Sequence, residues 1–275
     1  MRKSGYHLNL KSVALLAAAV GLAVGLGSPW NNAFAAEPEL EIRVIYDNTS
    51  ARGDVKEDWG FSSVVTFRGR RVLFDSGTDP DLFLTNLAKM EVEPGSIEKS
   101  IISHEHRDHR SGIYKLYPLN RRIGVYFLDA FLQEAYDQAE AIGMKPVRVT
   151  EPFEVVPGAY STGIIDGAPP EQSLAVEASQ GIVLLVGCSH PGIVKIVETV
   201  EKQRGADSIR LVLGGFHMFQ QDPAQIREQV AALRRLNVRR VMPAHCSGDL
   251  AKKIFAEAYG SDYEPLGAGK ILRLE

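Results

Sequence analysis

Short apolar runs rich in β-branched residues alternate with longer amphipathic stretches from about residue 40 onward. Alternating or continuous apolar runs of about four to eight residues are typical of strands, whereas apolar positions three and four apart are typical of helices. We expect strands at 41–46, 62–67, 71–74, 99–103, 123–128, 174–177, 182–186, 209–213, 238–242 and 270–274, with antiparallel strands within 146–165. We expect helices at 79–90, 111–117, 130–142, 191–204, 222–236 and 247–259.

The order of these elements indicates the fold class. The first part of the chain is rich in strands, and its last third alternates helix and strand. This pattern predicts sheets covered by helices, a layered α/β or α+β sandwich. Residues 36–275 are expected to form one continuous domain, because no repeat or low-complexity tail interrupts the pattern.

The first 35 residues are typical of a secretory signal peptide. Positive charge at Arg2, Lys3 and Lys11 accompanies an apolar stretch at 13–26, and Ala33-Phe34-Ala35 matches the pattern that signal peptidase cuts. We expect Sec-type export to the periplasm or the cell exterior, with cleavage near Ala35 and no stable membrane insertion afterwards. An uncleaved anchor is the alternative, although the apolar run is shorter than the about 20 residues of a transmembrane helix.

Charge gives no sign of a nucleic-acid partner. The chain has a formal net charge of -3, and its arginines are scattered rather than gathered into a dense basic patch. We therefore expect a small-molecule substrate. The sequence carries no signal for an oligomeric state.

Six of the seven histidines lie in four short motifs that follow predicted strands. The first motif, HEHRDH at 104–109, places three imidazoles and an aspartate after the strand at 99–103. The other three motifs contribute His190, His217 and His245. Imidazole and carboxylate are ligands for zinc, manganese or iron, whereas ordinary turns favour Gly, Pro, Asn, Asp and Ser. The sequence therefore predicts a metal site where these strand ends meet.

The two cysteines, Cys188 and Cys246, each lie within two residues of a candidate ligand histidine. A disulfide is permitted by export, a thiolate ligand is a second reading, and two small buried side chains beside the site are a third. If the strand ends converge, the sulfurs should lie within roughly 10 Å of each other. Free or metal-adjacent thiols are expected, because bound metals would already hold these loops together.

Three motifs together resemble the metallo-β-lactamase superfamily: HxHxDH at 104–109, Cys-Ser-His at 188–190 and Pro-Ala-His at 243–245. The LFDSG run at 73–77 resembles its first motif, whose aspartate, here Asp75, supports the metal loop. More narrowly, 187–194, 214–217 and 245–246 are similar to β-lactamase superfamily II metal-dependent hydrolases. That branch includes archaeal proteins named for dihydropterin-ribofuranosylaminobenzene-phosphate synthesis. The resemblance implies an α+β fold, an αβ/βα four-layer sandwich with the metal site at the edge between two mixed sheets.

The resemblance also implies two divalent metal ions, with zinc preferred and manganese or iron as alternatives. One ion would be held by His104, His106 and His190, and the other by Asp108, His109 and His245. The chain lacks the usual third-motif histidine near 162–164 and has Cys188 where an aspartate is usual. Either His190 or Cys188 then fills the vacated ligand position, and His190 is favoured because imidazole suits all three metals.

The function expected from these residues is an exported metal-dependent hydrolase acting on an ester, lactone, amide or phosphoester. A metal-bound hydroxide would form near pH 7 and act as the nucleophile. Asp108 would orient that water or protonate a leaving group, and His217 is either an acid or oxyanion partner of the substrate or a packing residue. Asn48 and Trp59, on a long loop, either line the pocket or lack a role. The alternatives are a catalytically altered metal-binding protein and a pterin-related synthase or transferase.

Overall fold

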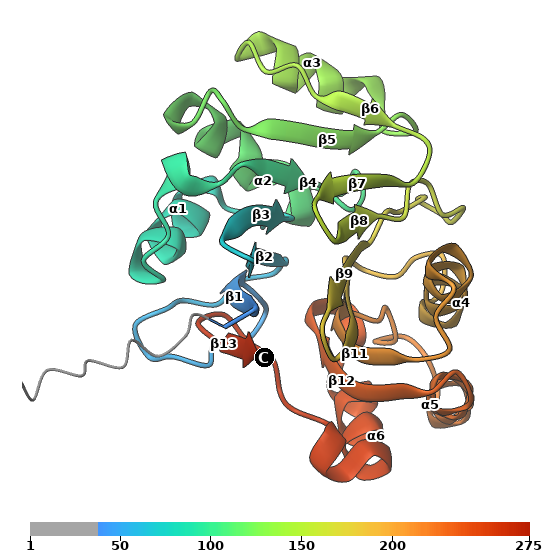
Figure 1. Cartoon of the computed structure of the whole chain (residues 1–275). Coiled ribbons are helices and arrows are strands. Elements are labelled where there is room, and N and C mark those ends of the chain that lie inside the picture. Colours follow the sequence, from blue (N-terminus) through green and yellow to red (C-terminus); the bar gives the residue numbers. More distant parts are fainter. Residues whose placement is uncertain (1–37) are drawn as a thin grey trace, which may run out of the picture. The chain divides into compact units, whose positions relative to one another are not determined.

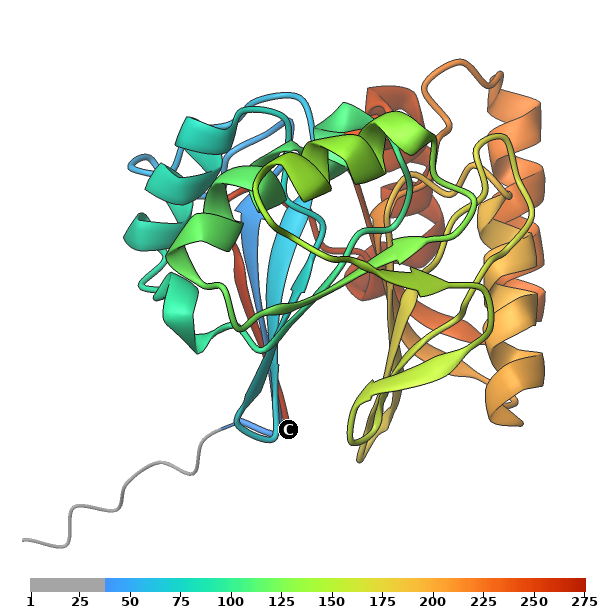
Figure 2. The same ribbon diagram turned by 90° about the horizontal axis from the view of Figure 1, so that it is seen from above.

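The computed structural model describes residues 38–275, so the expected signal peptide and its cleavage site lie outside the described residues. Two mixed sheets face each other, with helices on both outer faces (Figures 1 and 2). The first sheet has the strand order β13(Ile271–Leu274)-β1(Leu40–Tyr46)-β2(Ser62–Phe67)-β3(Arg70–Phe74)-β4(Lys99–Ile101)-β5(Gly124–Leu128)-β6(Val147–Val149). The second has the order β12(Val238–Ala244)-β11(Ile209–Gly215)-β10(Gly181–Val186)-β9(Leu174–Ala178)-β8(Ala159–Ser161)-β7(Phe153–Val156).

Each helix layer covers one sheet. The first sheet is covered by α1(Pro80–Lys89), α2(Arg107–Leu116) and α3(Gln133–Ala141), and the second by α4(Ile193–Arg204), α5(Pro223–Arg235) and α6(Asp249–Tyr259) (Figure 1). Short 3₁₀ turns lie at Pro94–Ser96, Tyr117–Leu119, His245–Ser247 and Gly260–Asp262. The four-layer αβ/βα sandwich expected from the sequence is confirmed.

Three apolar clusters hold these four layers together. The central one lies between the sheets and includes Phe74, Val183 and Leu213, all fully buried. One outer cluster packs α1–α3 on the first sheet, and the other packs α4–α6 on the second. Burial of apolar surface on both faces of a sheet explains why strands such as β10 are almost continuously apolar rather than alternating.

Strand direction determines where the functional loops lie. In the first sheet β3, β4 and β5 are parallel. Strands β1 and β3 each pair antiparallel with β2, so β1 runs in the same direction as β3. In the second sheet β10, β11 and β12 are parallel. The carboxyl ends of parallel strands meet at one edge of a sheet, and ligands commonly bind there.

Two local expectations were wrong. Helix α2 begins at Arg107 rather than Ser111, so Asp108 and His109 lie in its first turn and not in a loop. The sequence spacing hides this start, because the histidine-rich motif lacks the apolar periodicity by which helices are detected. The second error concerns only part of 146–165: β7 and β8 form the expected antiparallel pair, but β6 belongs to the other sheet and pairs in parallel with β5. Among residues 38–275, no helix is long and apolar enough to cross a membrane.

Candidate metal centre

The chemically active side chains gather where strands of both sheets end. From the first sheet, Asn48 follows β1, Asp75 follows β3, and His104 follows β4. From the second, Cys188 and His190 follow β10, while His217 follows β11 and His245 follows β12. The convergence predicted from the sequence is therefore present in the structure.

The backbone turns sharply at these strand ends. Four non-glycine residues with positive φ lie here: Asp75 at 58°, Ser189 at 64°, His217 at 48° and His245 at 45°. The left-handed region costs a non-glycine residue of order 1–3 kcal/mol and persists only where surrounding contacts require it. Strain of this kind clusters at functional sites, and here the strained residues come from both sheets and lie around one centre.

The candidate ligands form two trios whose donor atoms lie within 4.8 Å of one another. The first trio is His104, His106 and His190, and the second is Asp108, His109 and His245. In the second trio His109 Nε2 lies 3.2 Å from His245 Nε2, and Asp108 Oδ2 lies 3.3 Å from His245 Nε2. These are the two groups that the sequence assigned to two ions. Their roles as ligands stay a prediction.

Hydrogen bonds fix which nitrogen of His245 faces the cluster. Asn48 Oδ1 accepts the backbone N–H of Gly60 at 3.0 Å, so this oxygen can only accept from His245 Nδ1, 2.8 Å away. The Nδ1 atom therefore carries the proton, and the lone pair of Nε2 is left toward the second trio. A partner that holds the tautomer in this way is the usual support of a ligating histidine.

Asp75 holds the first sheet's histidines in the same manner. Its carboxylate accepts the backbone N–H of Ser103 at 2.7 Å and the Nδ1–H of His109 at 2.7 Å. It also accepts from the Ser103 hydroxyl at 2.8 Å, which leaves the Ser103 oxygen to accept from His104 Nδ1 at 2.9 Å. One buried aspartate thus directs Nε2 of both histidines into the centre.

The two sheets approach each other closely beneath the ligands. A Cβ atom on Gly187 would lie 2.1 Å from Ser103 Oγ and 3.3 Å from Asp75 Oδ2. Any side chain at position 187 would therefore push apart the Asp75 network and the turn that carries Cys188. Glycine is required here by contact between the sheets rather than by backbone conformation.

Donor chemistry at the centre fits a cation. Burial, together with the neighbouring histidines, lowers the pKa of His104 well below its usual range and that of His190 to about 3. Neutral imidazole is the form that binds metal. His190 Nε2 is buried without a hydrogen-bond partner among the described residues. An orphaned buried acceptor is costly, and coordination of a divalent cation within the first trio would satisfy it.

The two thiols lie at the base of the centre. Their Sγ atoms are 3.3 Å apart, which confirms the predicted proximity, and both are buried free thiols. Cys188 Sγ also lies 3.2 Å from His109 Nε2. Burial raises the pKa of Cys188, whereas hydrogen bonds with Cys188 and His217 outweigh burial and hold the pKa of Cys246 well below the usual thiol range. Both His190 and Cys188 therefore lie within reach of a metal.

His217 lies beside the first trio. Its ring centroid is 4.2 Å from that of His190, and its Nδ1 atom is buried without a partner among residues 38–275. A side-chain hydrogen bond with Cys246 raises its pKa. The position suits an acid or an oxyanion partner better than simple packing, because a packed histidine would have both nitrogens satisfied.

Sequence reasoning missed two buried carboxylates. Glu171 accepts the backbone N–H groups of Ser189 and His190 at 2.9 and 3.0 Å, and burial raises its pKa to about 7. Asp47 accepts the N–H of His245 at 2.8 Å. Both stabilise strained turns rather than supply ligands. No spacing in the sequence marks them, since Glu171 follows a Pro-Pro pair and Asp47 begins a long polar loop.

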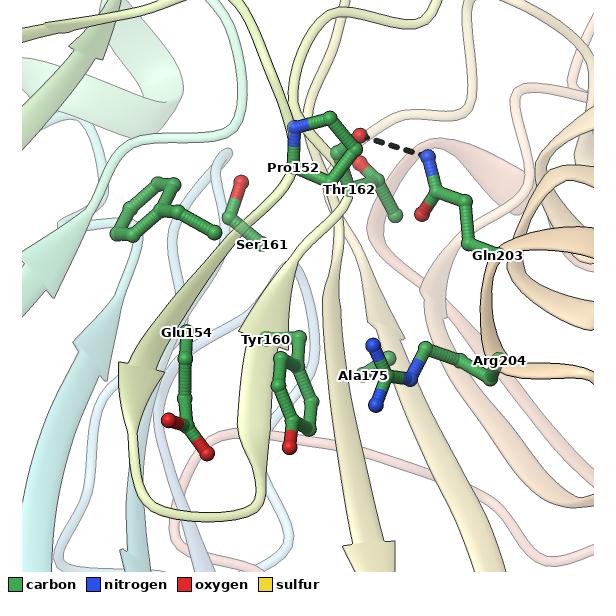
Figure 3. A pocket seen from close by; sticks show the side chains of 9 residues that line it. Pro152, Glu154, Tyr160, Ser161, Thr162, Ala175, Gln203 and Arg204 are labelled. Carbon is green, nitrogen blue, oxygen red and sulfur yellow. Dashed lines mark hydrogen bonds between the residues drawn. The ribbon is translucent and has the colours of Figure 1, made fainter.

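A separate cavity of about 230 Å³ lies between β7, β8 and α4 (Figure 3). None of its lining residues belongs to the histidine cluster. Its polar groups are already engaged: Arg204 stacks on Tyr160 at 3.6 Å and donates to Glu177 at 2.7 Å, and Gln203 donates to Thr162 O at 3.0 Å. The cavity therefore offers few free groups to a ligand.

The chain is similar to known proteins in sequence and in fold. The chain is 28% identical over 248 residues to the 7,8-dihydropterin-6-methyl-4-(β-D-ribofuranosyl)-aminobenzene-5'-phosphate synthase of Methanocaldococcus jannaschii, covering 74% of this chain and 84% of that protein. The crystal structure of Tm1679, a metal-dependent hydrolase of the β-lactamase superfamily, matches with a TM-score of 0.72 and 25% identity over 86% of this chain and 99% of its own. The chain belongs to the metallo-β-lactamase superfamily.

The metallo-β-lactamase fold extends to more distant members. The metallo-β-lactamase fold protein YhfI from Bacillus subtilis superposes with a TM-score of 0.66 at 12% identity, covering 85% of this chain and 99% of its own. No protein-family model matches the chain. Within the superfamily of metal-dependent hydrolases, this member has a histidine-rich cluster whose donor atoms lie close enough together to hold metal ions.

Proposed function

We propose that this protein is a metal-dependent hydrolase that cleaves an ester, lactone, amide or phosphoester of a small molecule. The observation that carries the proposal is the pair of donor trios at one sheet edge, because six donor residues exceed what one tetrahedral ion takes. Two divalent ions, with zinc preferred over manganese or iron, would be held by His104, His106 and His190 and by Asp108, His109 and His245. Bound ions of this kind would lower the pKa of a coordinated water to about 7.

The chain's own residues would divide the remaining work. Asp108 receives a hydrogen bond from Trp59 Nε1 at 2.9 Å, and its side chain stays partly exposed, so it can meet both a ligand and solvent. It is the group best placed to orient a nucleophile or to protonate a leaving group. His217, whose buried Nδ1 has no partner within residues 38–275, would donate to charge that develops on the substrate.

Metal analysis and a substrate panel test the proposal. The purified and reconstituted protein should carry one to two metal ions per chain and should release product from a chromogenic ester or phosphodiester only when metal is present. Less than half an equivalent of any transition metal would overturn it. Full occupancy with no turnover across the panel would instead favour a catalytically altered metal-binding protein.

The second candidate is a pterin-related synthase or transferase, favoured by the 28% identity with the archaeal synthase. Its test is condensation of a ribofuranosylaminobenzene phosphate with a dihydropterin that carries a leaving group on its 6-methyl carbon, followed by chromatography of the joined product and the released group. Formation of the condensed product, without hydrolysis in the panel, would replace the hydrolase by this function.

Localisation in the periplasm or outside the cell is part of the same proposal. The support is the composition of residues 1–35, which ends in Ala33-Phe34-Ala35. Mass spectrometry of the native protein should give a chain that begins at or near Ala36. An intact leader on soluble cytosolic material would contradict export and leave the hydrolase proposal unaffected.

A further inference from the structure

Two exposed aromatic side chains flank the candidate metal centre. Trp59 is 50% exposed and Phe219 is 47% exposed, and they are the two aromatics among the large apolar side chains that the described residues leave exposed. Trp59 lies on the loop between β1 and β2, and Phe219 on the loop between β11 and α5. Each sheet therefore contributes one ring.

Both rings lie against histidines of the candidate metal centre. The Trp59 ring lies 5.0 Å from that of His245, and the Phe219 ring lies 5.3 Å from that of His217. The two aromatic rings meet edge to face, with centroids 6.4 Å apart. Exposed apolar surface beside a polar centre is unfavourable unless a ligand covers it, and such patches commonly mark binding sites.

Hydrogen bonds hold the Trp59 ring in place. Its Nε1–H donates to Asp108 Oδ2 at 2.9 Å, its backbone carbonyl accepts from the Thr78 hydroxyl, and two residues along the loop Phe61 N donates to Asp108 O at 3.2 Å. An exposed tryptophan with this many constraints loses little freedom when a ligand contacts it. Preorganisation of this kind favours binding.

Gly248 allows the loop that carries Phe219 to pack closely against the turn before α6. A Cβ atom on Gly248 would lie 2.8 Å from Phe219 Cα, and Gly248 has a φ of 79°. The turn before α6 therefore lets the Phe219 backbone pack directly against the His245 loop. The ring is presented beside the histidines by this contact.

We propose that Trp59 and Phe219 form an aromatic subsite that binds a planar ring of the substrate next to the bond acted on at the metal centre. This deepens the proposed function, on which it rests, by assigning the substrate to aryl or heteroaryl esters and phosphoesters. Aromatic side chains contact planar rings edge to face or in offset stacks, and saturated rings of similar size lack that electrostatic preference.

The test compares two non-hydrolysable probes, phenylphosphonate and cyclohexylphosphonate, on the zinc-loaded full chain. Calorimetry should show tighter binding of the phenyl compound by about 2- to 12-fold, the range that an aromatic pair contributes. Phe219→Leu should remove most of this preference while zinc content stays unchanged. Leu119→Ala, at another exposed apolar position in the 3₁₀ turn after α2, is the control and should keep the preference.

Tryptophan fluorescence tests whether the phenyl ring of the probe binds next to Trp59. The chain has two tryptophans, Trp30 and Trp59, so Trp30→Phe leaves Trp59 as the single reporter. Phenylphosphonate should change its emission more than cyclohexylphosphonate does. Equal affinities for both phosphonates, or no binding of either, would overturn the subsite.

The two proposals fail in different ways. A phenyl preference without hydrolysis of any substrate leaves the subsite standing and removes the hydrolase. Metal-dependent hydrolysis at equal rates on aryl and alkyl esters, together with equal phosphonate affinities, supports the hydrolase and removes the subsite. If the chain takes up no metal, the same comparison on metal-free protein decides the subsite by itself.

Discussion

The two sheets build their halves of the candidate centre differently. The first sheet supplies His104, His106, Asp108 and His109 from six consecutive residues at the junction of β4 and α2. The second sheet supplies His190 and His245 from separate strand ends. His190 follows Ser189, which has a positive φ, and His245 itself has a positive φ. Local chain geometry positions the ligands from the first sheet, the first half of the centre. The pairing of β10, β11 and β12 positions those from the second sheet, the second half.

This difference shows where the ligand assignment is firm. In the first half the donor atoms cannot be rearranged without unwinding the start of α2, and Asp75 directs two of the histidines. In the second half Cys188 belongs to two further groups whose donor atoms lie as close together as those of the proposed ligands, one with His190 and His217 and the other with His245 and Cys246. Several side chains there could take one coordination position, so substitutions in this half should redistribute ligands rather than remove the site.

Loss of a first-half ligand should have the largest effect. His106 is an exposed residue at the start of α2, and its Nδ1 lies 3.1 Å from His104 Nε2. His106→Ala should reduce turnover of the best panel substrate by at least about 100-fold, since even outer partners of ligands are worth about 10- to 100-fold. Circular dichroism and thermal melting should show little loss of fold. Full activity of this variant would remove the motif from the mechanism.

A pair of second-half variants separates the two candidates for one ligand position. His190→Ala should lower the metal content by about one ion per chain, because the buried Nε2 of His190 has no other partner among the described residues. Cys188→Ser should keep the metal content of the unmodified protein. Elemental analysis measures both, and cobalt substitution adds a second reading, since thiolate coordination gives a charge-transfer band in the near ultraviolet. The opposite result would assign the position to Cys188.

Periodicity predicted a layered sandwich of sheets and helices, and the resemblance of the histidine motifs to the superfamily implied its four-layer form. The convergence of the strand ends was predictable because the carboxyl ends of parallel strands meet at one edge. It missed the helical start at Arg107, where polar donors replace the apolar spacing. It also missed Glu171 and Asp47, since a buried carboxylate that accepts backbone N–H groups needs only the right place in space. Those contacts are tertiary and leave no periodic trace in the chain.

A smaller effect is expected from the residue that orients His245. Asn48→Ala removes the acceptor of His245 Nδ1–H and should weaken metal affinity by about 10- to 100-fold without abolishing binding at high metal concentration. Competition with a chromophoric chelator measures this affinity. Asn48→Asp retains an acceptor at the same place and should recover much of the loss. Unchanged metal affinity in both variants would show that the backbone at His245, and not the hydrogen bond with Asn48, orients its ring.

The smallest effect concerns pH and the Asp75–His109 pair in metal-free protein. Burial opposes protonation of His109, but the Asp75 carboxylate outweighs it and raises the pKa of His109 to about 9. A group whose pKa is raised on folding stabilises the fold fully below its unfolded pKa, near 6.5, and this contribution is lost as pH rises through the folded pKa. The destabilisation caused by Asp75→Asn should therefore be greatest below about pH 6.5 and should shrink toward pH 9. Urea unfolding of both proteins with chelator present, at several pH values, gives this difference and cancels the titration of Cys246 and other groups common to both. A difference that is constant with pH would mean that Asp75 acts only through hydrogen bonds to a neutral His109.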